Sequence, residues 1–213
     1  MPFAELPERA AWTHQSARSG FEVVFFRPID TGYLLEGSTT AVEDGQAWIV
    51  DYRIALDAAW ATRRARVTGR WSGGSGSTLL ETDGPGHWRV DGEPAAHLDG
   101  CLDVDLESSA VTNALPVHRF GLHVGMEGSA PAAYVRALDL SVERLEQEYR
   151  RIDDEGPYQH FDYRAPAFDF ACRLVYDESG LVVTYPALQH ALPEHPRGGT
   201  EAPLEAVVPD ERR

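Results

Sequence analysis

Short stretches of alternating apolar and polar residues, separated by glycine, proline and aspartate, run through most of the chain and predict a mostly antiparallel β fold. In residues 47–56, the side chains of Trp48, Val50, Tyr52 and Ile54 would all fall on one face of a strand. Residues 21–26 and 61–71 predict further strands. The small residues of 72–77 predict a flexible tip.

Residues 1–192 suit one β-barrel-like domain, because sandwiches and barrels of about 200–250 residues fold undivided. From residue 193 onward the chain is rich in proline, glutamate and arginine without periodicity, which predicts a disordered tail over 193–213. Residues 141–151 allow two interpretations. Val142, Leu145 and Tyr149 fit helical spacing, whereas Glu143, Leu145 and Gln147 fit strand alternation.

All 19 basic side chains are arginine, and the formal net charge is −15. Without lysine the chain can form no Schiff base and no P-loop contact to a phosphate. Pyridoxal-phosphate enzymes, lysine aldolases, P-loop NTPases and ordinary protein kinases are therefore excluded. Because an acidic surface repels phosphates, we do not expect nucleic acid as a partner.

Cys101 and Cys172 are the only cysteines, too few for a disulfide framework or a cysteine-rich zinc site. The first residues lack the features of a secretory signal, and no apolar run reaches the ~20 residues that span a bilayer. We therefore expect a cytoplasmic protein with no membrane span.

Residues 97–106 alternate between potential ligands and apolar residues, so a strand would place His97, Asp99, Cys101, Asp103 and Asp105 on one face. A metal site is one interpretation, but positions two apart on a strand lie about 7 Å from each other, so at most two could reach one ion. A carboxylate pair for glycoside hydrolysis is another. The favoured interpretation has no metal: a half-buried strand whose polar face meets water or a hydrated lumen.

Residues 108–120 combine small hydroxylated residues, an asparagine and a proline, which predicts a structured loop. Asn113 and Arg119 could form a polar rim for the head of a ligand. The equal alternative is that this loop only locks the local conformation.

The run 100–106, followed by Thr112-Asn113 and 115–119, closely resembles the central signature of the bacterial family described as putative glycolipid-binding. Other segments on both sides of this signature are similar to landmarks of that family and occur in the same order as in the family. They are residues 52–66, 87–92, 145–149, Tyr163 and 180–186. The sequence departs from the family at Ala110, Ala114 and His118, where a proline, a threonine and an arginine are usual.

The resemblance implies an open or splayed antiparallel β-barrel with little helix, similar in shape to bacterial lipoprotein carriers. It also favours strand over helix for residues 141–151. The leading hypothesis is a carrier or sensor that holds a lipid or glycolipid in a β-barrel cavity, with the tail buried against apolar strand faces. The candidate ligand-binding residues are Trp60, Trp88, Asp103, Asp105, Asn113, Arg119, Tyr163 and Tyr185.

Two other hypotheses remain open. The sequence has no Gly-x-Ser-x-Gly elbow, no His-Glu-x-x-His and no Gly-x-Gly-x-x-Gly after a strand, so we expect a binding protein without a cofactor rather than an enzyme. The enzyme alternative is a hydrolase that uses Asp103 or Asp105 with His97 or His118 as acid and base. The third hypothesis is a structural module, such as a homodimer formed through a sheet edge.

Overall fold

A computed structural model of the chain describes residues 3–14, 19–43, 45–83, 86–185 and 188–190. The strands are β1 (Arg9–His14), β2 (Ser19–Ile29), β3 (Gly32–Glu43), β4 (Gln46–Asp57), β5 (Thr62–Trp71), β6 (Gly74–Thr82), β7 (Trp88–Val90), β8 (Glu93–Pro94), β9 (Asp103–Leu106), β10 (Glu127–Ser129), β11 (Ala132–Val135), β12 (Val142–Leu145), β13 (Glu148–Glu155), β14 (Tyr158–Ala165), β15 (Phe170–Tyr176), β16 (Val182–Tyr185) and β17 (Leu188–His190). The helical segments are the α-helix α1 (Ala114–Phe120) and the 3-10 helices η1 (Ala96–Leu98), η2 (Val111–Asn113) and η3 (Pro166–Phe168). The tail predicted over 193–213 lies outside the described residues.

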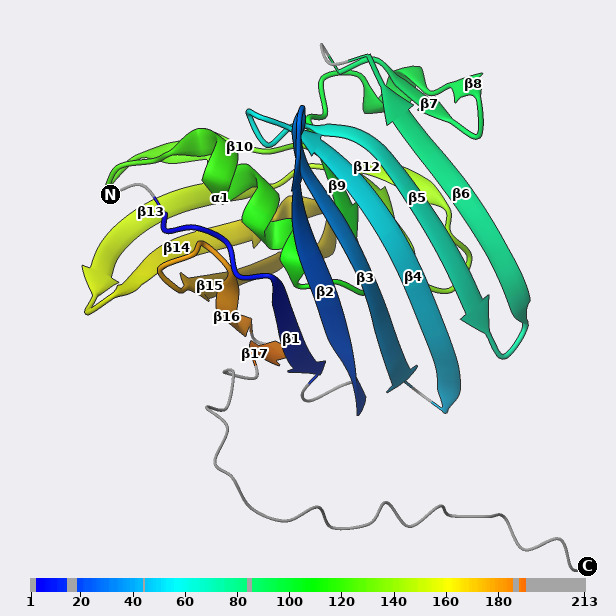
Figure 1. The fold of residues 1–213 in the computed structure, drawn as a ribbon, viewed down its shortest axis with the longest axis horizontal. Helices are drawn as coiled ribbons and strands as arrows, with labels where there is room; N and C mark the ends of the chain where they lie inside the picture. The colour runs from blue at the N-terminus through cyan, green and yellow to red at the C-terminus, as the bar shows by residue number, and fades with distance from the viewer. Residues whose placement is uncertain (1–2, 15–18, 44, 84–85, 186–187, 191–213) are drawn as a thin grey trace, which may run out of the picture.

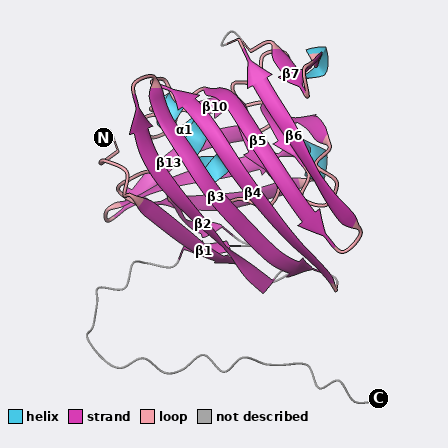
Figure 2. Cartoon of the chain, turned by 45° about the vertical axis from the view of Figure 1, so that its right-hand side comes forward, coloured by secondary structure: helices cyan, strands magenta, loops and turns pink. Residues whose placement is uncertain are grey.

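Within the described residues, one sheet runs in the order β10-β13-β14-β15-β16-β17-β1-β2-β3-β4-β5-β6-β7-β8. Neighbouring strands in it pair antiparallel, as the long β2–β3 and β3–β4 hairpins do. The sheet bends into two facing halves, one carrying β2–β6 and the other β13–β15 (Figures 1 and 2). It does not close into a barrel, so the predicted open antiparallel β architecture with little helix is confirmed.

Strand alternation positions the core as predicted in the first half of the sheet. In β4, the side chains of Trp48, Val50, Tyr52 and Ile54 are buried on one face. Each large apolar side chain removed from water in this way contributes about 1.5–3 kcal/mol. The tip between β5 and β6 is shorter than predicted, because residues 74–77 already pair with β5.

Residues 141–151 form parts of β12 and β13, so the helix interpretation is wrong. Leu145, Gln147, Tyr149 and Arg151 are all buried, whereas the residues between them are exposed. A burial period of two is that of a strand with one face in the core.

Residues 108–120, predicted as a loop, contain η2 and α1 instead. Pro116 is the third residue of α1, where its missing N–H breaks no intrahelical bond. Gly121 ends the helix at φ 55°, in the left-handed conformation that glycine adopts without steric cost. This short helix lies between the two halves of the sheet (Figure 1).

The polar face of residues 97–106 meets water only at its start, where His97 and Asp99 are exposed, whereas Cys101, Asp103 and Asp105 are buried. Only Asp103–Leu106 forms a strand, β9, and all four of its side chains are buried. The backbone of β9 pairs with β11 in a small second sheet, while the Thr62 hydroxyl of β5 accepts a hydrogen bond from the Val104 N–H. The prediction of a half-buried strand facing a hydrated lumen is therefore wrong, because β9, η2 and α1 themselves occupy the space between the sheet halves.

Candidate functional site

A buried ion pair joins the strand β9 to the last turn of α1. Arg119 Nε donates to Asp103 Oδ1 at 3.3 Å, and Arg119 Nη2 donates to Oδ2. Asp103 is almost fully buried, and this burial raises its pKa, although the Arg119 guanidinium acts in the opposite direction. The two residues are 16 positions apart and belong to different elements, so their ion pair fixes α1 against the small central sheet.

Asp105, two residues further along β9, accepts two hydrogen bonds. Thr112 Oγ1 donates to Oδ1 at 2.7 Å and Gln147 Nε2 donates to Oδ2 at 2.6 Å. Gln147 also donates to the Tyr163 hydroxyl at 3.0 Å. Burial raises the pKa of Asp105 to about 6, despite the two donors that favour its ionised form.

Asn113 is used by the protein itself. Its side-chain oxygen accepts from the Tyr149 hydroxyl at 3.2 Å, and its backbone oxygen accepts from the Tyr176 hydroxyl at 3.1 Å. These bonds anchor the start of α1 to β13 and β15, as expected for a conformational lock. We call the residues of these three neighbouring hydrogen-bonded groups the polar core: Asp103, Asp105, Thr112, Asn113, Arg119, Gln147 and Tyr163.

The structure thus brings together five of the predicted site residues, which are Asp103, Asp105, Asn113, Arg119 and Tyr163. Their bonded partners are other protein groups, and their contact with a ligand stays a prediction. Gln147 was missed, although its place in the alternating pattern with Leu145 and Tyr149 points it to the same face.

A third buried acid, Glu22 on β2, was also missed. Its carboxylate accepts from the Tyr52 hydroxyl at 2.6 Å, from Ser109 Oγ at 2.5 Å and from the Ala110 N–H at 2.7 Å. Burial raises the pKa of Glu22. A single acid within the apolar stretch 21–26 was a signal in the sequence, since charged side chains are seldom fully buried without partners.

Within the described part of the chain, the Trp88 side chain forms no hydrogen bond with this network. Trp88 is buried, and its indole N–H donates to the backbone oxygen of Cys101 at 2.9 Å, which fixes β7 to the segment before β9. Tyr185 belongs to β16, but its side chain lies outside what the structure describes.

Trp60, the remaining predicted residue, lines an open pocket of about 470 Å³. We call it the aromatic pocket, because four of its lining residues carry aromatic rings other than imidazole. Its lining residues are Phe3, Ala4, Glu5, Leu6, Tyr33, Trp60, Val117, His118, Gly121, Leu122, His123, Arg151, Gln159 and Phe161. These come from the N-terminal arm, the β4–β5 turn, the end of α1 and the β13–β14 hairpin, so the pocket lies where both sheet halves meet α1.

The turn between β4 and β5 holds Trp60 in place. Asp57 Oδ1 accepts from the N–H groups of Ala59 and Ala61, and the Asp57 backbone oxygen accepts from the Trp60 N–H. Trp60 has φ 67°, a left-handed conformation that costs a bulky residue about 1–3 kcal/mol. Such strain persists where the surroundings fix the residue, and here the Trp60 ring stacks on the His118 ring at 3.6 Å between centroids.

Two basic side chains that line the aromatic pocket, His118 and Arg151, carry no free positive charge. Burial lowers the pKa of His118 to about 4, so the imidazole is uncharged at neutral pH. Arg151 is 5% exposed, pairs with both carboxylate oxygens of Asp154 and lies over the Phe161 ring. Arg151 Nε is buried without a protein partner in the described part of the chain.

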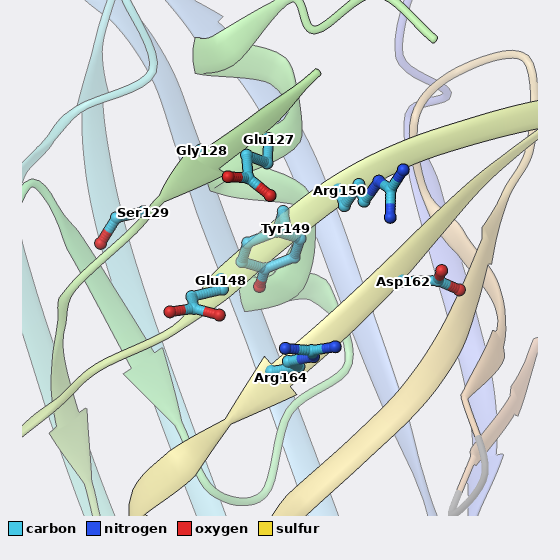
Figure 3. A pocket seen from close by; sticks show the side chains of 8 residues that line it. All are labelled: Glu127, Gly128, Ser129, Glu148, Tyr149, Arg150, Asp162 and Arg164. Carbon is cyan, nitrogen blue, oxygen red and sulfur yellow. The ribbon is translucent and has the colours of Figure 1, made fainter. Parts of the chain in front are cut away.

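A second pocket, of about 410 Å³, lies on the outer face of β10, β13 and β14 (Figure 3). Its charged side chains are Glu127, Glu148, Arg150, Asp162 and Arg164. These charges alternate across the paired strands, with Glu127 opposite Arg150 and Glu148 opposite Arg164. Five of the eight residues that line this groove are charged, so the aromatic pocket is the better site for an amphipathic ligand.

The acid–base pairs of the hydrolase hypothesis are not formed. Among the described residues, no hydrogen bond joins Asp103 or Asp105 to His97 or His118, and His97 lies near the backbone oxygen of Val142 instead. The described residues also contain no group of three histidine, cysteine, aspartate or glutamate side chains that could hold a metal ion. No helix in the described ranges is both long enough and apolar enough to cross a membrane.

Comparisons with known proteins agree with this architecture. A family model described as "Putative glycolipid-binding" matches residues 9–191. The crystal structure of a DUF1089 family protein from Pseudomonas aeruginosa is 32% identical, with a TM-score of 0.68 over 82% of this chain and 92% of that one. A beta-barrel-like protein of the domain of unknown function DUF1849 from Brucella abortus shares the fold at 9% identity, with a TM-score of 0.50 over 82% of this chain and 87% of that one. No curated protein matches the sequence.

Proposed function

The chain belongs to the family described as putative glycolipid-binding, and we propose that it binds a neutral glycolipid-like molecule whose sugar head occupies the aromatic pocket. The observation that carries this proposal is the pocket itself, which combines aromatic walls with a few polar groups in about 470 Å³. Sites for small molecules have this size and this mixture of linings.

Aromatic surface is available for stacking on a sugar ring. The rings of Phe3 and Tyr33 are half-buried, and they pack on His118 and Trp60 at centroid distances of 4.5 and 5.0 Å. Such a cluster is rigid and amphipathic, so it presents contact area at little cost in conformational entropy. Gln159 and Arg151 line the same pocket and carry polar groups that suit sugar hydroxyls.

The charges favour a neutral head over an anionic one. Arg151 is already paired with Asp154, His118 is uncharged at neutral pH, and Glu5 adds a negative charge at the rim. The whole chain carries a net charge of −15. An anion entering this pocket would meet no free cation strong enough to offset its desolvation.

This proposal moves the ligand from the predicted barrel cavity to the aromatic pocket. The space between the sheet halves holds β9, η2 and α1, whose side chains are buried against the sheet. The polar core would then act on the ligand indirectly, because it fixes the position of α1, which carries His118.

The test is a calorimetric titration with octyl glucoside below its critical micelle concentration. Leu122 lies half-buried in the pocket wall, so Leu122→Trp should fill the pocket and weaken binding at least tenfold, about 1.4 kcal/mol. Octyl phosphate should bind the unmodified protein more weakly than octyl glucoside does.

Val124→Trp is the matched control, since Val124 is exposed two residues away and does not line the pocket. Its affinity for octyl glucoside should equal that of the unmodified protein. The proposal fails if the unmodified protein does not bind octyl glucoside, or if Val124→Trp weakens binding as much as Leu122→Trp.

A further inference from the structure

The two halves of the sheet part along the first half of β1. Residues Trp12, Thr13 and His14 pair with β17, but in the described register Arg9, Ala10 and Ala11 pair with β2 alone. Within the described residues, β17 therefore covers only the second half of β1. The sheet is held together further along, where the Trp12 indole N–H donates to the backbone oxygen of Val182 at 2.6 Å.

A groove of about 560 Å³ opens beside these residues, and we call it the seam groove. Its walls are the first half of β1, the β13–β14 hairpin tip and the β15–β16 turn. The apolar and aromatic lining residues are Ala4, Pro7, Ala10, Ala11, Val23, Pro157, Tyr158 and Leu181. Most of this lining carries no hydrogen-bonding group, so water in the groove gains little from it.

Apolar surface continues from the seam groove over the outer face of β2. Phe21 and Phe25 flank Val23 on the same side of the strand, and they are 54% and 56% exposed. Contiguous exposed apolar surface of this kind commonly marks a place where something binds.

The seam groove and the aromatic pocket meet at the N-terminal arm, because Ala4 and Glu5 line both. A backbone hydrogen bond from the Ala4 N–H to the Glu178 oxygen, at 2.7 Å, ties the arm to the β15–β16 turn. Figure 1 shows the arm, in blue, running past α1 to reach β1 beside the strands β15 and β16. The two cavities are therefore adjacent, with Ala4 and Glu5 of the arm between them.

We infer that the seam groove is the binding site for the hydrocarbon chain of the same amphipathic ligand. This inference rests on the proposed function, since the head in the aromatic pocket would direct the chain past the arm into the groove. The occupant is a single alkyl or acyl chain, because the lining is apolar and the rim carboxylates of Glu5, Asp177 and Glu178 outnumber the one cation, Arg9. An anionic group would be repelled from that rim.

The experiment is a calorimetric titration with glucosides of increasing chain length: hexyl, octyl and decyl glucoside, each below its critical micelle concentration. If the chain is buried in the seam groove, each added methylene should raise the affinity of the unmodified protein about fourfold. Ala11→Trp places a large ring in the groove, so its affinities should no longer rise from hexyl to decyl glucoside. Its affinity should fall least for hexyl glucoside and most for decyl glucoside, because the head site is untouched and the shorter chain places fewer methylenes in the groove.

Thr13→Trp is the matched control. Thr13 lies two positions further on the same face of β1, is exposed and is absent from the groove lining, so its chain-length dependence should match the unmodified protein. Leu122→Trp should lower the affinity for all three glucosides by a similar factor, since it blocks the head.

These variants separate the two ideas. If no glucoside binds the unmodified protein, the proposed function is wrong. If glucosides bind and Leu122→Trp weakens them, but Ala11→Trp keeps the full chain-length dependence, then only the seam groove assignment is wrong. Light scattering tests whether the groove binds a second copy of the protein instead. The assignment is also overturned if Ala11→Trp abolishes a dimer of the unmodified protein without changing the chain-length dependence.

Discussion

Arg119→Met is expected to lower the free energy of unfolding by about 3–5 kcal/mol at pH 7, because it leaves the buried Asp103 carboxylate without its cation. Asp103 and Arg119 side chains are 2% and 14% exposed, so water cannot replace the lost guanidinium. Burial already raises the pKa of Asp103, and removing the opposing cation should raise it further. Urea unfolding followed by circular dichroism measures the loss, which should shrink at acid pH as Asp103 takes up a proton.

The matched control is Arg173→Met, which removes the cation of an exposed ion pair with Asp162. Surface pairs of this kind contribute about 0–1 kcal/mol, so its loss should be small. The double variant Asp103→Leu/Arg119→Met should be more stable than Arg119→Met alone, because no uncompensated charge remains buried. Equal losses for Arg119→Met and Arg173→Met would contradict the role of the buried pair.

The strands of the sheet could be predicted from the sequence because they are specified by patterns among residues that are close together in the chain. In β4 and β5, alternation between apolar and polar residues and the turns between them specify both the strands and their inward faces. The same alternation in residues 97–106 was misinterpreted, because a period of two does not say whether the polar face meets water or another polar side chain. The partners of Asp103 and Asp105, which are Arg119 and Gln147, come from segments that only the tertiary fold brings together.

The aromatic pocket could not have been found from local pattern. Its walls combine Phe3, Tyr33, Trp60, His118 and Phe161, which are far apart in sequence. The helix α1 was hidden for a different reason, since it has only seven residues and its third is a proline. Trp60 borders the β4–β5 turn, and the structure places it in the pocket, where its contact with a ligand stays a prediction.

Two buried groups oppose each other in the pH dependence of stability. The pKa of Asp105 is raised from 3.8 to about 6, so its contribution to stability is present at low pH and is lost as the pH rises to 6, by about 3 kcal/mol. The pKa of His118 is lowered from 6.5 to about 4, so its contribution is present above pH 6.5 and is lost as the pH falls to 4. That second change is up to about 3 kcal/mol, reduced because His118 is partly exposed.

When either group is replaced, the titration of the other should therefore dominate the pH dependence of stability. Asp105→Asn should be more stable than the unmodified protein at pH 7 by up to about 3 kcal/mol, because Gln147 can turn its amide to accept from the new side chain and no buried charge remains. Its stability should rise from pH 4 to 6.5 more steeply than that of the unmodified protein, whereas His118→Gln should show the opposite change of slope. Urea unfolding at several pH values measures all three slopes, in dilute protein because the sequence pI of about 4.8 lies in this range. Asp103 and Glu22 are present in all three proteins, so their titration largely cancels from the differences between the stability curves. Three parallel curves of stability against pH would show that neither Asp105 nor His118 is held in the ionisation state described.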